Sequence, residues 1–369
     1  MEIIKKYHQL DYYTSRLLDR YFGGMKIGVF DIETLGLNPA LTEVVLAGFL
    51  EVNPDGSATA TQFFANQKSD EPELLEAIFR EFEKYDVLLT YNGKHFDLPF
   101  VCKRAELNGF EDVRVGCHNL DLYLVLHGHS TLKQTIKSLK QKNVEDYMGL
   151  HVDRKDEISG ADSILLYEAY VEEKDPAQKE LLKQKILLHN HDDILQLYRI
   201  LPVIQQTDIH RAMSYLGFPV RHTLAADGST APADSGWPQL NIGRIRVDSK
   251  GLTVAGTYGG PRLSYTSYDS GMAPYSCHFT EEGEFQFLFY TQRHKNSHYI
   301  ELATLLDNER LQYMTRYPAH VNGFLILTEG NRTNYLEVNM FIQTFLQQFM
   351  EQTACPSQPE ESHEQLSFF

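Results

Sequence analysis

The sequence predicts an α/β protein in which a mixed sheet flanked by helices is followed by a smaller β-rich domain. The first observation is that apolar runs of strand length alternate with segments of helical periodicity up to about residue 205. The second is a stretch rich in Ala, Ser, Gly and Pro at 222–238, after which strand-like runs dominate. At 369 residues with 42% hydrophobic content, the chain is long enough for two domains, each with its own core.

The first part of the chain is predicted to hold most of the helices. Apolar side chains near helical spacing predict an N-terminal helix over 1–22. The main domain, 23–205, then begins with strands, and Pro72 lies close to the first turn of a helix predicted at 73–85. A further helix ends at Leu107, and several more follow up to about residue 203. The predicted strands of this domain are 26–30, 44–52, 59–65, 87–90 and 113–123.

The second part is predicted to be a linker at 206–238 followed by a β-rich domain at 239–352. One hairpin is expected around Asp-Ser-Lys-Gly, between 244–247 and 252–257, and a second between 284–292 and 297–302. A helix at 335–352 closes the domain. Aromatic side chains alternate along these strands, which favours packing in a core over stacking on unpaired bases.

The composition excludes several classes of protein. There is no apolar run of about eighteen residues and no basic-then-apolar N-terminus, so we expect a cytoplasmic protein without a membrane span or a signal peptide. The four cysteines include no CxxC pair, which argues against a zinc ribbon or a disulfide scaffold. A net charge of −16 argues against a broad electrostatic grip on duplex phosphates, although a metal site with a narrow basic groove is compatible with it.

Two carboxylates at the end of the first strand of the main domain are the most informative feature. Asp31 and Glu33 are two positions apart, and residues at this spacing point to the same face of a strand. Both side chains can therefore approach one metal ion. A solvated strand edge explains the pair equally well, so its meaning depends on further carboxylates.

A third carboxylate follows the predicted strand at 87–90. Asp97 stands directly before Leu98-Pro99, where a helix begins. Because Asp before Pro is a good N-cap arrangement, capping and metal binding are both open for this residue. Asp121, at the end of another predicted strand, is expected to have a structural role.

A fourth carboxylate lies in a late helix with the sequence His-Asn-His-Asp-Asp. His189 and Asp193 are four residues apart and share a helix face, so both can point at one site. A solvated His/Asp cluster is the alternative reading. The neighbouring Asp192 leaves open which of the two aspartates is the ligand, and we favour Asp193.

Together these segments resemble the DEDD superfamily of ribonuclease-H-like 3′→5′ exonucleases. Asp31 and Glu33 match its Asp-x-Glu motif, and His189 and Asp193 stand at the spacing of its Tyr-x-x-x-Asp motif. Histidine replaces tyrosine there, whereas histidine in this superfamily usually comes with a longer spacing. The resemblance covers about 20–205, is strongest to bacterial ribonuclease-H-like proteins of YprB type, and implies a ribonuclease-H-like fold in a cytoplasmic bacterial protein. The Asn-x-x-x-Phe-Asp motif of the superfamily is matched by Asn92, Phe96 and Asp97.

The resemblance also implies a chemistry, the hydrolysis of phosphodiester bonds at single-stranded or frayed 3′ ends. Two divalent cations, Mg²⁺ or Mn²⁺, would be held by carboxylates, because hard ions prefer oxygen ligands. His189 would accept a proton from the attacking water. An RNA-processing exoribonuclease and a non-catalytic scaffold of the same fold are the alternatives. The implied metal ligands are Asp31, Glu33, Asp97 and Asp193, and the implied contacts to the terminal nucleotide are Thr34, Leu35, Asn92 and Phe96.

The last segment carries a separate motif. Residues 353–369 are polar and acidic and predict a disordered tail, yet they end in an apolar cluster. That cluster resembles the bacterial sliding-clamp binding peptide Gln-Leu-Ser/Asp-Leu-Phe, and docking back onto the β-rich domain is the alternative. A clamp partner favours DNA over RNA as the substrate. The matching positions are Gln365, Leu366, Ser367 and Phe369, with Phe368 where leucine is usual.

Overall fold

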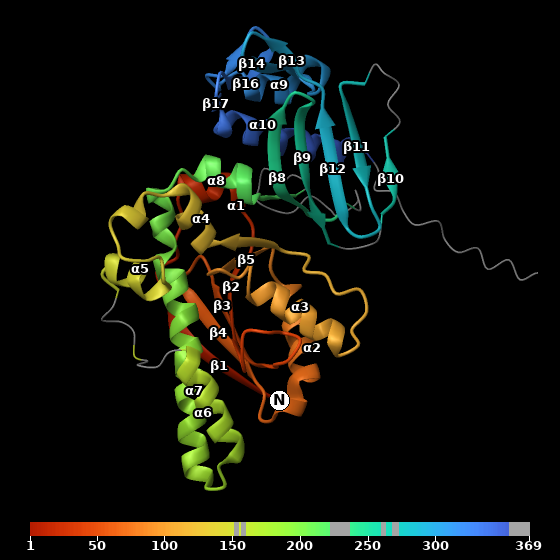
Figure 1. The fold of residues 1–369 in the computed structure, drawn as a ribbon. Coiled ribbons are helices and arrows are strands. Elements are labelled where there is room, and N and C mark those ends of the chain that lie inside the picture. Colours follow the sequence, from red (N-terminus) through yellow and green to blue (C-terminus); the bar gives the residue numbers. More distant parts are fainter. Residues whose placement is uncertain (151–154, 156–159, 222–236, 260–262, 268–272, 354–369) are drawn as a thin grey trace, which may run out of the picture. The chain divides into compact units, whose positions relative to one another are not determined.

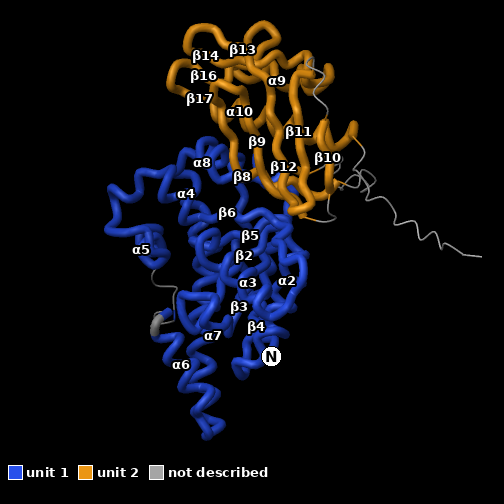
Figure 2. Tube along the Cα trace, turned by 45° about the vertical axis from the view of Figure 1, so that its right-hand side comes forward, with its two compact units in different colours: residues 1–219 blue, residues 220–369 orange. Residues whose placement is uncertain are grey.

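The computed structural model describes residues 1–150, 155, 160–221, 237–259, 263–267 and 273–353. The chain divides into two compact units, Met1–Pro219 and Val220–Phe369 (Figure 2). The predicted linker at 206–238 is not irregular throughout, because its described part contains α8 (Ile209–Leu216) and the short strand β7 (Pro219–Val220). The amphipathic helix α8 buries Ile209 and Met213, which gives it a place in a core rather than in a linker.

Unit 1 is built around a six-stranded mixed sheet with the strand order β1-β4-β3-β2-β5-β6 (Figure 1). The neighbours β1 and β4, β4 and β3, and β3 and β2 pair antiparallel. The neighbours β2 and β5, and β5 and β6, pair parallel. The predicted mixed sheet is therefore confirmed. Its strands are β1 (Glu2–Gln9), β2 (Ile27–Thr34), β3 (Val44–Val52), β4 (Ser57–Phe64), β5 (Val87–Thr90) and β6 (His118–Asp121).

Helices cover both faces of this sheet (Figure 1). On one face, Ile78 of α2 packs in a core with Phe49 of β3, and on the other, Leu187 of α7 packs with Leu46 of β3. Strand residues alternate between the two faces, so one apolar strand serves both layers. The helices of unit 1 other than α8 are α1 (Arg16–Phe22), α2 (Glu71–Phe82), α3 (Asp97–Leu107), α4 (Leu122–His129), α5 (Gln141–Tyr147), α6 (Gly160–Glu172) and α7 (Pro176–Ile200), with short 3-10 turns at Lys68–Asp70, Leu132–Gln134 and Leu201–Gln206.

The predicted N-terminal helix over 1–22 is wrong for its first half. Residues Glu2–Gln9 form β1, which pairs antiparallel with β4 along its whole length. The exposure of these residues alternates with the period of two that a strand requires. The apolar residues of this segment recur about every 3.6 residues, as in a helix, but eight register pairs with β4 hold it as a strand. Only α1, capped by the side chain of Ser15, is helical.

Unit 2 contains two antiparallel sheets, one with the order β10-β11-β12-β9-β8-β7 and one built on β13-β14-β16-β15. The first predicted hairpin is confirmed as β8 and β9, whereas the second is wrong in one strand. β12 pairs with β9 and β11, and β14 pairs with the short β13 and with β16. These strands are β8 (Leu240–Asp248), β9 (Gly251–Tyr258), β10 (Tyr265–Thr266), β11 (Tyr275–Phe279), β12 (Glu284–Phe289), β13 (Gln292–His294), β14 (Ser297–Glu301), β15 (His320–Val321), β16 (Phe324–Glu329) and β17 (Arg332–Thr333).

The core of unit 2 is aromatic. Helix α10 (Tyr335–Gln352) has the predicted bounds, and the Phe345 ring lies 4.7 Å from that of Phe289 on β12. The strand aromatics of β12 are buried, as the core interpretation predicts. The other helices of unit 2 are α9 (Asn308–Met314) and a 3-10 turn at Leu302–Thr304. None of the helices in the described ranges combines the length and the apolar composition needed to cross a membrane.

Candidate metal centre

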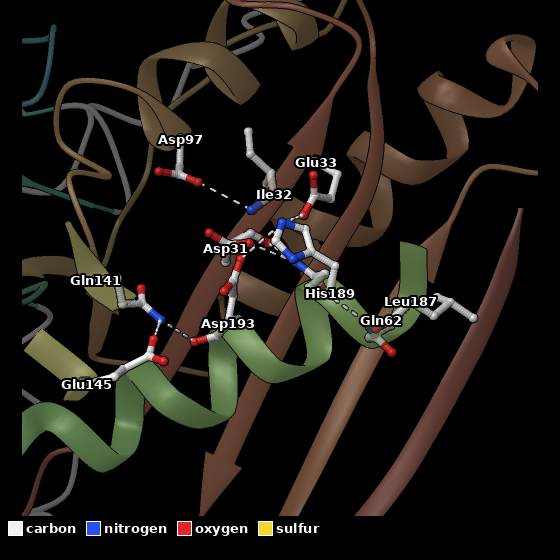
Figure 3. A network of polar contacts seen from close by, with 11 residues as sticks. Asp31, Ile32, Glu33, Gln62, Asp97, Gln141, Glu145, Leu187, His189 and Asp193 are labelled. Carbon is white, nitrogen blue, oxygen red and sulfur yellow. Dashed lines mark hydrogen bonds and ion pairs between the residues drawn. The ribbon is translucent and has the colours of Figure 1, made fainter. Parts of the chain in front are cut away.

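The site begins at the end of β2. Asp31 and Glu33 point to the same side of the sheet, the side covered by α7 (Figure 3). Residues at odd and even positions of a strand face opposite layers, which is why Ile32 between them joins the α2 core instead. Glu33 is 7% exposed, so its carboxylate lies in a region from which water is largely excluded.

Helix α7 brings a histidine and a carboxylate to the same point. The Nε2 atom of His189 lies 3.7 Å from Oε1 of Glu33 and 3.6 Å from Oδ2 of Asp193. The three side chains offer ligand atoms that all lie within 4.8 Å of one another. Asp192 faces away from this group, because its Oδ2 accepts the backbone N–H of Lys155 at 2.6 Å. Of the two aspartates left open by the sequence, the structure brings Asp193 to Glu33 and His189.

Asp97, the first residue of α3, also turns toward β2. Its Oδ1 accepts the backbone N–H of Ile32, at 3.3 Å, so the side chain turns to β2 between Asp31 and Glu33 (Figure 3). The residue preceding it, Phe96, occupies the N-cap position, and no side chain caps this helix. The capping interpretation of Asp97 is therefore not supported, and its carboxylate is available to the site.

The loop before Asp97 is held by a carboxylate that the sequence predicts to be structural. Asp121 accepts the backbone N–H groups of Asn92, at 2.9 Å, and Lys94, at 3.0 Å. Its Oδ1 also caps α4 at Leu124. Asn92 has a positive φ of 66°, which asparagine tolerates better than most residues. These bonds fix the turn that delivers Asp97 to the end of β5.

The pKa values of the site carboxyls Asp31, Glu33 and Asp97 are raised, because burial and mutual repulsion disfavour their anionic forms. Desolvation raises the pKa of Asp31 well above its usual value, and Asp97, Asp193 and Glu33 raise it further. Burial likewise raises the pKa of Glu33 to about 7, against the opposing effect of His189. The pKa of Asp97 is also raised, mainly by burial, to about 7. A cation among carboxylates this close together would stabilise their anionic forms, and the side chains offer carboxylate oxygens and one imidazole nitrogen as metal ligands.

A match to a family model agrees with this fold. Residues 29–205 match the sequence model of the RNase_H superfamily. Unit 1 contains a ribonuclease-H-like domain. Over 99 residues the chain is 30% identical to a DNA polymerase of Methanocaldococcus jannaschii, which covers 25% of this chain and 6% of that protein. The family B DNA polymerase of the archaeon Pyrobaculum calidifontis matches with 22% identity and a TM-score of 0.38, over 49% of this chain and 25% of that one. The chain thus spans a small part of each polymerase.

Asn190, a residue that the sequence analysis did not single out, orients the Asp31 carboxylate. The Nδ2 atom of Asn190 donates to Oδ2 of Asp31, at 2.9 Å, while its Oδ1 accepts from Nε2 of Gln62, also at 2.9 Å. Asp31, Gly48 and Gln62 are register partners across β2, β3 and β4. Asn190 lies over the middle of this row, where a Cβ on Gly48 would come 2.1 Å from its Oδ1. The glycine inside an apolar strand run was the available signal.

A second missed residue is Ser163 of α6. Its hydroxyl bonds to the carboxylate of Glu33 and lowers the pKa of Glu33 against the effect of burial. Ser163 itself is 3% exposed, so this bond is shielded from water. The preceding segment 156–159 lies outside the described residues, and nothing in the sequence around Ser163 distinguishes it from a helix-start serine.

The four positions expected to contact the terminal nucleotide adjoin the site residues along the chain, since Thr34 and Leu35 follow Glu33, and Asn92 and Phe96 precede Asp97. The N–H of Leu35 already donates to the carbonyl of Glu43, at 3.0 Å, so the Thr34-Leu35 backbone can offer carbonyl groups but not this donor. The hydroxyl of Thr34 donates to the carbonyl of Gly36. Phe96 is partly buried against Phe100, with 5.4 Å between the rings. The clamp-like residues 365–369 lie outside the described residues.

Proposed function

We propose that the ribonuclease-H-like domain is a metal-dependent 3′→5′ exonuclease of DEDD type, related to proteins of YprB type, acting on single-stranded or frayed DNA. The observation that carries the proposal is the convergence of four carboxylates and one imidazole from β2, α3 and α7. Two hydrogen-bonded supports, Asn190 and Ser163, fix the orientation of these carboxylates. A buried acidic group of this kind has no structural use that an apolar residue would not serve better.

The residues fit two divalent cations, Mg²⁺ or Mn²⁺, which would be held by Asp31, Glu33, Asp97 and Asp193. When bound, the cations stabilise the negative charge that develops on the attacking and leaving oxygens. His189 accepts a proton from the attacking water through Nε2, the atom that faces Glu33 and Asp193. The new bond joins water oxygen to phosphorus, and the bond from phosphorus to the 3′ oxygen of the preceding nucleotide breaks. That oxygen takes a proton from solvent, which leaves a 3′-hydroxyl on the shortened strand and releases a nucleoside 5′-monophosphate.

Other residues of the chain bind and orient the strand. Asn190 keeps the Asp31 carboxylate turned toward the site, because its amide donates to Asp31 while accepting a hydrogen bond from Gln62. Asn92 and Phe96, on the loop before α3, would contact the terminal nucleotide. Together with the Thr34-Leu35 carbonyl groups, they supply one polar and one apolar surface for a sugar and a base.

The proposal is tested with a 5′-labelled oligonucleotide in Mg²⁺ or Mn²⁺. Wild type is expected to shorten the strand from its 3′ end, and Asp31→Asn and Asp193→Asn to lose about 10²-fold or more in rate. Asp192→Asn is the matched control, since Asp192 faces away from the site. Retained activity in Asp193→Asn with loss in Asp192→Asn would move the fourth ligand to Asp192. Intact substrate with wild type, together with no metal binding, would leave the non-catalytic scaffold as the function.

The choice of DNA over RNA rests on the clamp-like peptide at 365–369, which we propose tethers the nuclease to a sliding clamp. Tethering raises the local concentration of DNA ends, which a chain of net charge −16 attracts poorly. Deleting Gln365–Phe369 is expected to abolish binding to a purified bacterial clamp and to leave hydrolysis of short oligonucleotides unchanged. Faster cleavage of a matched RNA strand would assign the enzyme to RNA instead.

A further inference from the structure

One stretch of the ribonuclease-H-like domain is basic in an acidic protein. Between Asp121 and Glu145 the chain holds no acidic residue, although it has 50 Asp and Glu in total. The second half of this stretch contains four lysines, which we call the lysine strip: Lys133, Lys137, Lys140 and Lys142. A run of this composition concentrates positive potential on one part of an otherwise acidic surface.

The strip is ordered by its apolar residues rather than by its charges. Leu132, Leu139 and Val144 are buried, at 5%, 4% and 0% exposure, while all four lysines between and beside them are exposed. The segment also ties itself together, because Nδ2 of Asn143 donates to the hydroxyl of Ser138 at 2.6 Å. The lysine side chains are therefore displayed to solvent from a fixed backbone.

Several basic side chains elsewhere in unit 1 form ion pairs with carboxylates of the same unit. Examples of such ion pairs join Lys26 to Glu51, Lys84 to Glu81, Lys103 to Glu106, Lys183 to Glu2 and Arg104 to Glu71. In the ranges that the structure describes, no ion pair of this kind involves Lys133, Lys137 or Lys140. Their charge is thus left for a partner of opposite sign outside the chain.

The segment that carries the lysine strip is hydrogen-bonded to the backbone of Asp193, a residue of the metal centre. Nε2 of Gln141 donates to the main-chain carbonyl of Asp193, at 3.0 Å, and to Oε1 of Glu145, at 3.1 Å (Figure 3). On the other side, the hydroxyl of Tyr91 donates to the carbonyl of Leu139 at 2.5 Å. Tyr91 directly precedes Asn92, which begins the loop that delivers Asp97. Two of the site-forming segments therefore hold the strip in place next to the carboxylates.

Aromatic rings accompany the charges. The ring of Tyr123 on α4 lies 5.8 Å from that of Tyr91 and 5.5 Å from the imidazole of His127. Tyr123 is partly exposed and His127 is exposed, one helical turn apart on α4. Partly exposed rings beside a row of cations are the combination that binds unpaired bases along with their phosphates.

We propose that the lysine strip, with Tyr123 and His127, binds the phosphodiester backbone of a single strand and leads its 3′ end to the metal centre. The proposal rests on the exonuclease function and names the surface that recognises its substrate. A single strand fits better than a duplex, because the carboxylates lie in a buried site and the positive charge is confined to one narrow segment. A duplex would bring a second row of phosphates against an acidic surface.

The test compares a triple variant, Lys133→Gln, Lys137→Gln and Lys140→Gln, with a control triple of equal charge, Lys5→Gln, Lys68→Gln and Lys174→Gln. The control lysines are exposed and lie on β1, in the 3-10 turn before α2 and between α6 and α7. The probe is a fluorescein-labelled oligothymidylate of about 15 nucleotides in Ca²⁺, measured by anisotropy over a range of salt. The strip variant is expected to reduce the slope of log K against log salt by about 2, with affinity about 100-fold lower near 50 mM salt and under about tenfold lower near 0.5 M.

Kinetics separate this inference from the exonuclease proposal. On long oligonucleotides in Mn²⁺ the strip variant is expected to raise KM with little change in kcat, and on thymidine 5′-(p-nitrophenyl phosphate), which is too short to reach the strip, both constants should match wild type. Tyr123→Leu is expected to weaken binding by about tenfold without changing the salt slope. Wild-type slope and KM in the strip variant, or equal losses in the control, would overturn the inference. If wild type cleaves neither substrate, the exonuclease proposal fails, while the oligothymidylate binding data still decide the role of the strip.

Discussion

Replacing Gly48 by alanine tests whether Asn190 positions the metal centre. An added Cβ would lie 2.1 Å from Oδ1 and 2.9 Å from Cγ of Asn190, which is fully buried and has no open space to enter. The amide must therefore give up its 2.9 Å bonds to Asp31 and Gln62. Overpacking costs about 1–3 kcal/mol and each lost buried hydrogen bond about 1 kcal/mol, so we expect a destabilisation of roughly 3–5 kcal/mol.

The expected loss of activity is about 10–100-fold, the usual effect of removing a residue that orients a metal ligand. Stability is measured by urea unfolding and activity as kcat/KM on a single-stranded oligonucleotide in Mn²⁺. Gly128→Ala on α4 is the matched control, since a Cβ there meets nothing within 4 Å. Asn190→Asp removes the amide donor without added bulk, and it should lower activity as well. If Gly48→Ala behaved like Gly128→Ala in both measurements, the positioning role of Asn190 would be refuted.

Three further predictions concern the buried carboxyls of the site, His189 and Arg104. Burial raises the pKa of the Glu33 and Asp97 carboxyls to about 7, so below about pH 4 their protonation stabilises the metal-free fold. This contribution, on the order of 3 kcal/mol for each carboxyl, is lost as the pH rises through 7. Mn²⁺ should therefore raise Tm more at pH 8 than at pH 5.5. Equal Mn²⁺ shifts at both pH values would contradict it. His189→Gln should lower kcat by about 10²–10⁴-fold while calorimetry shows unchanged Mn²⁺ binding, whereas loss of binding would make His189 a ligand. Arg104→Ala leaves Glu71, 3% exposed, without its bidentate partner and should cost about 3–5 kcal/mol in urea unfolding, with an effect below about 1 kcal/mol arguing against that pair.

The parts of the fold that the sequence predicts well are those set by local pattern. The strands at Val44–Val52 and Val87–Thr90 have the predicted bounds, because continuous apolar runs end at clear turn residues. Strand β1 was missed because its pairing with β4 joins residues 48 to 62 positions apart. A local periodicity argument does not register a partner at that distance.

The site shows the same division. Asp31 and Glu33 follow from strand geometry, and His189 and Asp193 from helix geometry, so the structure places all four as these rules require. The choice between Asp192 and Asp193 depends on what each faces, which needs the packing of α7 on the sheet. Asn190 was missed because its partners come from three separate strands.

The most direct test of the account is the number of Mn²⁺ ions bound at pH 8, measured by equilibrium dialysis with electron paramagnetic resonance detection of free Mn²⁺. Two ions are expected for wild type and for Asp192→Asn, with the loss of at least one ion in Asp31→Asn, which lacks one of the four carboxylates. Wild-type binding in Asp31→Asn, or no bound Mn²⁺ in the wild-type protein, would contradict the proposal that these carboxylates form a metal centre.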